Sequence, residues 1–188
     1  AMDSQGFIRV DAQRRTSRAN IYAIGDVAGQ PMLAHKASHE GRVAVEAIAG
    51  RRVAYEPLAV PAVVFTDPEI AWAGLTETEA KTQGRAYDVA RFPWGASSRA
   101  ATLGTHEGLT KLLVDPDTET ILGVGLVGPH AGELIAEGTL AVEMGANATD
   151  LGLTIHPHPT LSETLMEAAH VRHRNAAHYY TPRRKGKK

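Results

Sequence analysis

The sequence predicts an α+β fold, in which an antiparallel sheet is flanked by helices. Gly108–Val114 and Thr120–Val127 are two apolar stretches separated by Asp115 to Thr118, whose residues favour a tight turn, so they are predicted to form a hairpin. Ala131–Gly145 and about Leu161–Arg172 then carry helical patterns. Strands that pair with their sequence neighbours, with helices gathered on one side, are typical of α+β domains.

The N-terminal part of the chain has a different pattern. Gly6–Val10 and Asn20–Ile24 are predicted to be short strands, and Met32–Ala49 is predicted to be a helix. Gly50 is well placed to end that helix, because glycine adopts the left-handed conformation that often follows a last turn. Arg51–Pro57 is polar and ends in proline, so a linker and a domain boundary are expected there.

The elements between the linker and the hairpin complete the predicted sheet. Ala62–Thr66 and Glu69–Gly74 are expected to be strands around an Asp-Pro turn, and Ala86–Phe92 is expected to be another strand. Thr76–Gln83 is predicted to be a short helix, since Thr76 and Glu79 have the spacing of a capping box. We therefore expect residues 58–172 to form one domain after residues 1–57, with a basic, flexible tail over residues 173–188.

Composition and charge exclude several classes of protein. Apolar residues make up 43% and charged residues 22% of the 188, which is typical of a globular chain. No apolar run approaches the roughly 20 residues of a membrane helix, so no membrane association is expected. The last six residues, from Arg183, hold five of the 20 basic residues, and the rest of the chain, with 15 basic and 21 acidic residues, has a net charge of −6. An acidic body with a short basic tail is not typical of a nucleic-acid-binding domain.

Two stretches carry side chains suited to chemistry. In the first, a predicted strand ends in Gly25-Asp26, and a helix begins near Leu33, Ala34 and His35. A carboxylate at the end of a strand can accept hydrogen bonds from sugar or ribityl hydroxyls, and the amides at a helix start favour electron-rich groups. Gly-Asp after a strand is also common in simple turns, so this stretch alone leaves both interpretations open.

The second stretch runs from Ile155 to Glu163 and also has two interpretations. Thr160 and Glu163 have the spacing of a capping box, in which case His156 and His158 are ordinary loop histidines. Alternatively, Glu163 accepts a hydrogen bond from one nitrogen of His158, which leaves the other nitrogen free to take a proton from a thiol. No metal site is expected, because two histidines without a cysteine in the chain do not complete a zinc ligand set.

These stretches resemble two motifs of one family. Ile21–Val27, with Met32–Ala37 and Glu40-Gly41, resembles the second FAD-binding motif of the pyridine nucleotide-disulfide oxidoreductases. His-Pro-His-Pro-Thr-Leu-Ser-Glu is similar to that family's histidine–glutamate dyad motif, and both motifs are closest to the dihydrolipoamide dehydrogenases. Pro61–Glu77 resembles the start of the family's interface domain, and the whole resemblance covers roughly residues 5 to 170.

The resemblance implies a function for a longer protein. Asp26 would bind the ribityl chain of FAD, and the segment of Met32, Leu33, Ala34 and His35 would meet the flavin. His158 would be the base and Glu163 its orienting partner in the oxidation of dihydrolipoamide to lipoamide, with NAD as final acceptor. The implied protein is a cytoplasmic homodimer, closed by a two-fold axis through the domain from Leu58 onward. It would work with the lipoyl-bearing acyltransferase subunit of a 2-oxoacid dehydrogenase complex.

The departures from the family pattern define the alternatives. The first Gly-rich FAD motif, the redox cysteine pair and the NAD-binding domain are missing and are expected before residue 1. The chain therefore resembles a C-terminal portion that is inactive alone and does not retain FAD. The alternatives are a non-catalytic dimerisation or docking module and a glutathione- or mercuric-reductase-like flavoprotein. From about His170 the resemblance ends, and His173, His178, Tyr179 and Tyr180 match no recognised pattern.

Overall fold

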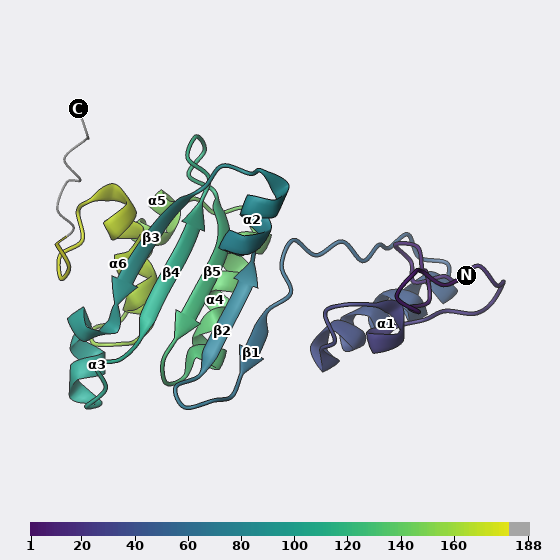
Figure 1. The fold of residues 1–188 in the computed structure, drawn as a ribbon, viewed down its shortest axis with the longest axis horizontal. Helices are drawn as coiled ribbons and strands as arrows, with labels where there is room; N and C mark the ends of the chain where they lie inside the picture. The colour runs from purple at the N-terminus through teal and green to yellow at the C-terminus, as the bar shows by residue number, and fades with distance from the viewer. Residues whose placement is uncertain (181–188) are drawn as a thin grey trace. The chain divides into compact units, whose positions relative to one another are not determined.

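The structure, a computed structural model, describes residues 1–180 and divides the chain into two compact units (Figure 1). The first unit is Ala1–Pro57 and the second begins at Leu58, so the division follows the proline that ends the predicted linker. Within residues 1–180, no helix combines the length and the apolar character that crossing a membrane requires.

The first unit is built around one helix. A short 3-10 helix, η1, spans Gly25–Ala28, and α1 spans Ala34–Ile48 and ends where Gly50 adopts a positive φ of 80°. The predicted strands Gly6–Val10 and Asn20–Ile24 are wrong. Only isolated bridges form there, between Met2 and Ile8 and between Arg15 and Tyr22, because neither stretch finds a continuous partner strand within the unit.

The second unit contains the predicted antiparallel sheet. Its five described strands lie in the order β1-β2-β5-β4-β3, and every neighbouring pair is antiparallel. The hairpin predicted around residues 115–118 joins β4 to β5 at the centre of the sheet, and this confirms the predicted fold class. The strands are β1 Ala62–Val64, β2 Ile70–Gly74, β3 Asp88–Pro93, β4 Leu109–Val114 and β5 Ile121–Val127.

Helices cover one face of this sheet (Figure 1). α4, Ala131–Glu143, contacts β2 and β5, while α6, Glu163–His173, contacts β3 and β4. α2, Glu77–Gln83, begins with the capping box that was predicted between Thr76 and Glu79. The short helices α3, Ser98–Thr102, and α5, Ala148–Leu153, were not predicted.

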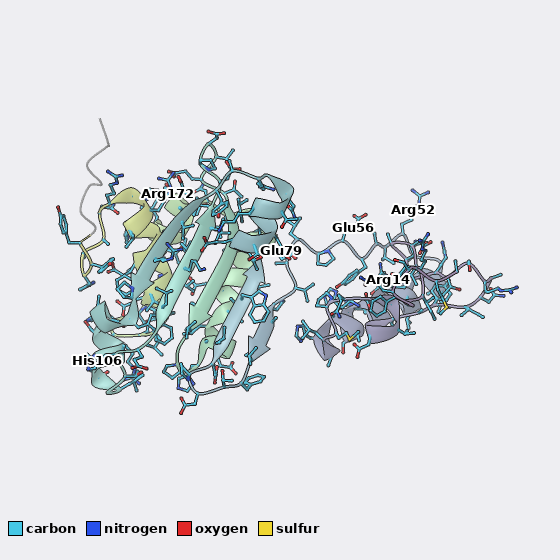
Figure 2. The ribbon with its side chains drawn as sticks, viewed as in Figure 1. Arg14, Arg52, Glu56, Glu79, His106 and Arg172 are labelled. Carbon is cyan, nitrogen blue, oxygen red and sulfur yellow. The ribbon has the colours of Figure 1, made fainter. Side chains whose placement is uncertain are left out.

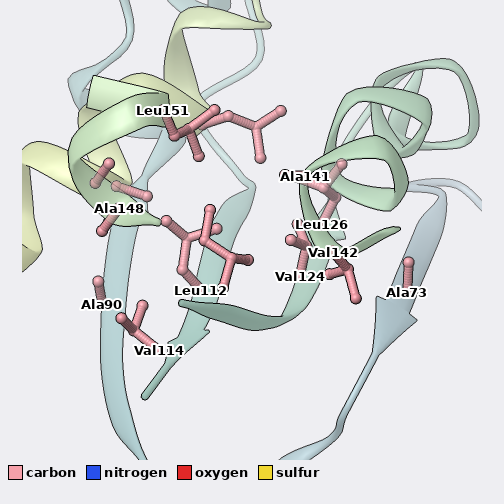
Figure 3. Close-up of a cluster of buried hydrophobic side chains, with 14 of the residues drawn as sticks. Ala73, Ala90, Leu112, Val114, Val124, Leu126, Ala141, Val142, Ala148 and Leu151 are labelled. Atoms are coloured by element: carbon pink, nitrogen blue, oxygen red, sulfur yellow. The ribbon is translucent and has the colours of Figure 1, made fainter. Parts of the chain in front are cut away.

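The core lies between the sheet and the helices. Figure 3 shows Val124 and Leu126 of β5 close to Ala141 and Val142 of α4, and Leu112 of β4 on the side of α5. Two large apolar residues, one on the other face of α4 and one at its C-cap, do not join this core. These two residues, Leu140 and Met144, are exposed.

Trp94 fixes the geometry where β3 ends. Its side chain is fully buried, and it lies against Gly108 and Gly128, where a Cβ atom would overlap the indole ring. Both glycines also have positive φ values, 155° and 147°, which L-residues rarely adopt. The indole Nε1 donates to Thr110 Oγ1 at 2.9 Å, so the ring is fixed by packing and by a hydrogen bond.

The chain after α6 keeps contact with the domain as far as Tyr179. Arg174 adopts a left-handed conformation, φ 58°, and ends α6. Ala176 and Tyr179 then contact the core. The Tyr179 and Phe92 rings pack edge to face, with their centroids 6.2 Å apart. Residues of this segment thus contact β3 and α6. The five basic residues of the expected tail from Arg183 onward lie outside the described residues.

The Trp94 contacts predict a large asymmetry between two glycine substitutions. Gly128→Ala is expected to lower the free energy of unfolding of the second unit by about 3 kcal/mol, since the new methyl group overlaps the indole and the backbone is strained. Gly125→Ala in β5, where a Cβ meets no atom within 4 Å, should change it by less than about 1 kcal/mol. Urea unfolding followed by tryptophan fluorescence measures both, and equal effects would contradict the packing described here.

Candidate active site

The second predicted stretch lies in the loop between α5 and α6. The His158 side chain is 60% exposed at the surface of this loop, whereas Glu163, the first residue of α6, is only 15% exposed. The sequence folds this way because Asn147 and Asp150 form a capping box that starts α5, and α5 ends at Leu153. The chain then crosses nine loop residues, in which two histidines alternate with two prolines, before it reaches α6.

One carboxylate serves two hydrogen bonds in this loop. Glu163 Oε1 lies 2.8 Å from His158 Nδ1, and Glu163 Oε2 accepts the Thr160 amide at 2.7 Å. The predicted His158–Glu163 bond is therefore confirmed as geometry, and it coexists with one half of the predicted capping box. The other half of the box, in which the Thr160 hydroxyl accepts the Glu163 amide, is wrong. α6 begins at Glu163, and the Thr160 hydroxyl donates instead to the Pro157 carbonyl at 2.8 Å.

The surroundings of Glu163 favour its ionised form. Partial burial raises the pKa of this carboxyl, but the hydrogen bonds from the Thr160 amide and the His158 ring oppose it, together with positive charge on His158 and His178. The net pKa lies below the usual value for glutamate. An ionised Glu163 can only accept, so His158 Nδ1 carries the proton in this bond.

A chain of buried hydroxyl groups fixes the start of α6 on the sheet. The Thr110 hydroxyl, which accepts from Trp94, donates to Thr164 Oγ1 at 2.7 Å, and the Thr164 hydroxyl donates to the Leu161 carbonyl at 2.7 Å. Thr110 and Thr164 are both buried. Because Thr164 directly follows Glu163, this chain of bonds holds the carboxylate in place relative to β4.

A second histidine–glutamate pair adjoins the first. Glu163 and Glu167 lie one turn apart on α6, and His178 Nδ1 lies 2.6 Å from Glu167 Oε1. Both pairs line one small cavity of about 10 Å³, beside Phe92 and Ser97. That volume is close to the minimum for one water molecule. The sequence analysis did not detect this pair, because its members are 11 residues apart with no shared motif.

A third histidine–glutamate pair lies beneath the loop. The His156 ring is 5% exposed, with Nε2 2.7 Å from Glu137 Oε1 of α4 and Nδ1 2.8 Å from the Thr154 carbonyl. The sequence analysis considered His156 only as a loop residue or a zinc ligand. Within residues 1–180, no three histidine, aspartate or glutamate side chains are arranged to hold a metal ion.

The first predicted stretch lies in the first unit. Asp26 in η1 is exposed, and so are Met32, Ala34 and His35, while Leu33 is half-buried. α1 begins after Leu33, whose side chain makes no capping hydrogen bond. Binding of an electron-rich group at this helix start stays a prediction.

A buried ionic cluster fixes η1 against α1. Glu40 of α1 is fully buried and accepts the Gly25 amide at 2.6 Å, while Arg14 and Lys36 lie 2.7 and 3.2 Å from its Oε1. Lys36 also donates to the carbonyls of Gly25 and Gly29. Figure 2 labels Arg14 in this unit. The i,i+4 spacing of Lys36 and Glu40 was visible in the sequence, although the burial of these charges was not.

Comparison with protein families finds two matches. Residues 60–169 match the model described as the pyridine nucleotide-disulphide oxidoreductase dimerisation domain. Residues 1–41 match the model described as pyridine nucleotide-disulphide oxidoreductase. The two models follow the order of the two predicted motifs.

Curated relatives carry one common name. A dihydrolipoyl dehydrogenase of Thermus scotoductus is 57% identical over 177 residues, which are 94% of this chain and 38% of that protein. A dihydrolipoyl dehydrogenase of Haemophilus influenzae is 53% identical over 170 residues, which are 90% of this chain and 36% of that protein. The chain thus spans a little over a third of the length of these relatives.

Solved structures share the fold. The crystal structure of LpdA from Mycobacterium tuberculosis superposes with a TM-score of 0.83 at 31% identity, over 90% of this chain and 37% of that one. The HOCl-induced flavoprotein disulfide reductase RclA of Escherichia coli gives a TM-score of 0.78 at 28% identity, over 88% of this chain and 38% of that one.

The lowered pKa of Glu163 predicts a pH-dependent contribution to stability. A carboxyl whose pKa is lower in the folded state stabilises the fold above its unfolded pKa, and the contribution is lost as the pH falls through the folded pKa. Glu163→Gln should therefore cost about 1 kcal/mol of unfolding free energy at pH 7, and the difference should shrink towards zero below about pH 4. Urea titrations at several pH values measure it.

The exposed Glu107 provides the control for this experiment. Glu107→Gln removes a carboxylate for which no hydrogen bond is found in the described part of the chain, so it should have little effect at either pH. A cost of Glu163→Gln that is the same at pH 7 and at pH 3.5 would show that the charge of Glu163 does not stabilise this loop.

Proposed function

The chain belongs to the pyridine nucleotide-disulphide oxidoreductase family, and we propose that it is the C-terminal part of a dihydrolipoyl dehydrogenase. In this proposal the longer protein oxidises dihydrolipoamide to lipoamide and reduces NAD⁺ to NADH. The chain supplies the dimer interface and the base that accepts the proton of the dithiol. The observation that carries the proposal is the 2.8 Å contact between His158 Nδ1 and the ionised Glu163.

His158 takes the role of base in this proposal. Its Nδ1–H donates to Glu163, so the lone pair of Nε2 remains available, and the side chain is 60% exposed. A dithiol placed against Nε2 gives up its S–H proton to that nitrogen, and the ring becomes an imidazolium. Glu163 holds the ring in the productive tautomer and stabilises the positive charge that forms on it.

The first unit fits the flavin end of an FAD molecule. Asp26 offers an exposed carboxylate for ribityl hydroxyls. The segment Met32–His35, where α1 begins, would offer backbone amides to the flavin. Bound FAD would supply the electron-accepting ring. The Glu40 cluster holds the Gly25 amide and carbonyl in place, so it positions Asp26 without touching the cofactor. NAD as final acceptor, an acyltransferase partner and a cytoplasmic location complete the proposal.

The dyad predicts unequal losses of turnover in the full-length protein. His158→Gln should lower turnover with dihydrolipoamide by at least about 10²-fold, because the base is removed. Glu163→Gln should cost less, because this residue orients the base and does not itself take the proton. Steady-state kinetics of the two variants measures this order.

A different interpretation of the loop makes different predictions for the same variants. If Glu163 only supports the start of α6, Glu163→Gln should be nearly silent, since glutamine also accepts the Thr160 amide. His158→Gln should then leave turnover almost unchanged. That pair of results would remove the catalytic role from both residues, provided that the wild-type protein is active.

We also propose that the second unit forms a homodimer and that the dyad loop lies at its interface. Ile155, three residues before His158, is 94% exposed, and Leu153 beside it is also exposed. Neighbouring exposed apolar side chains can form the patch that marks an interaction site, and stable dimer interfaces have a core-like apolar centre. Covering Ile155 would also shield His158 from bulk water.

The dimer should be visible in solution. Sedimentation of the chain at tens of micromolar is expected to give a dimer, and Ile155→Asp should shift it towards the monomer because a charge cannot be buried there unpaired. Val45→Glu, an equally drastic change on the exposed face of α1 in the first unit, should leave the dimer intact. A wild-type chain that sediments only as a monomer would contradict the proposed interface.

A further inference from the structure

His156 has more acceptors around it than a neutral imidazole can satisfy. Its Nδ1 lies 2.8 Å from the Thr154 carbonyl, which can only accept, so Nδ1 must carry a hydrogen. Its Nε2 lies 2.7 Å from a carboxylate oxygen of Glu137. A hydrogen must also lie between these two atoms, because two lone pairs at this distance repel each other.

The extra proton resides on the ring. Glu137 is 32% exposed and keeps contact with water, whereas the His156 ring is 5% exposed. The Thr154 carbonyl and the Glu137 carboxylate both offer oxygen acceptors at hydrogen-bonding distance, so the ring is the donor on both sides. In the described part of the chain, the one ion pair found for His156 is with Glu137. The pair is therefore an imidazolium–carboxylate bridge between the loop and α4.

This bridge is the main anchor of the segment before the dyad. In the described part of the chain, residues 155–157 make no other hydrogen bond to a helix or a strand. Ile155 and Pro157 on either side are exposed, so packing contributes little there. The direction in which the chain enters His158 consequently depends on where α4 holds the His156 ring.

We propose that His156 is a positioning residue for His158, held as an imidazolium between the Thr154 carbonyl and Glu137. This inference rests on the proposed function of the dyad. The bridge joins mid-α4 to the loop two residues before His158, so it sets the course of the backbone that carries His158. Loss of the bridge allows residues 155–158 to move, and a displacement of about 1 Å at a catalytic base can cost as much as 10²-fold in rate.

Two variants of Glu137 separate the loss of the anchor from the loss of its charge. Glu137→Ala removes the anchor. Glu137→Gln can keep it, because the glutamine amide donates to Nε2 of a neutral ring whose Nδ1–H still reaches Thr154. Glu133→Ala, one turn earlier on α4 and exposed, is the matched control.

The first measurement uses the chain itself and does not depend on activity. Ring ¹⁵N spectra of the wild-type chain near pH 7 should show His156 protonated on both nitrogens and His158 with its proton on Nδ1. Glu137→Ala should convert His158 to the mixed tautomers of a free loop histidine. Glu137→Gln and the Glu133 control should keep the His158 signal. A wild-type His156 that behaves as a neutral, freely titrating ring would overturn the inference.

The second measurement is turnover in the full-length protein. Glu137→Ala should lower kcat for dihydrolipoamide oxidation by about tenfold or more with little change in KM, and Glu137→Gln should stay within about threefold of wild type. Equal turnover in all three proteins would also overturn the inference. If the spectra show the bridge but the wild-type protein has no such activity, the proposed function fails and the anchoring of His158 stands on the spectra.

Discussion

The chain of buried hydroxyl groups from Trp94 through Thr110 to Thr164 is the constraint on which the site depends. A helix start is normally the least fixed part of a helix, because its first amides lack partners. Here the first turn of α6 is tied to β4 by hydroxyl groups that each accept one bond and donate another. Buried polar groups satisfied in this way have one low-energy arrangement, so the carboxylate beside Thr164 acquires a fixed position.

Glu163 uses that position for two purposes at once. One oxygen satisfies a backbone amide of the loop and the other orients an imidazole, so a single ionised group fixes the loop conformation and the tautomer of His158. The bond to the amide also lowers the pKa of the carboxyl against the effect of burial. The tautomer of His158 follows from the ionisation of its partner, and the ionisation follows from the backbone that the partner caps. The same two hydrogen bonds of Glu163 therefore set both the loop conformation and the position of the proton on His158.

The sequence predicted those features that depend on local pattern. The hairpin around residues 115–118, the box at Thr76 and Glu79 and the His158–Glu163 contact all join residues close in the chain, where turn and cap preferences act directly. It could not predict contacts that depend on how distant elements pack. His156 contacts Glu137, which lies 19 residues away in the sequence, and Arg14 contacts Glu40, which lies 26 residues away. The strands predicted before residue 25 were wrong for a related reason, since alternation alone does not supply a partner strand.

The exposure of His158 bears on what the site needs in order to work. In the proposed role, an imidazole that is 60% exposed would exchange its proton with bulk water and would not discriminate between a bound thiol and solvent. The groups behind the ring are already dry and fixed, since Glu163, Glu167 and His156 are largely buried. Only the outward side of the loop, with Ile155 beside it, faces water. The missing wall is therefore apolar and lies on one side, which is what a second copy of the same surface, related by a two-fold axis, would provide.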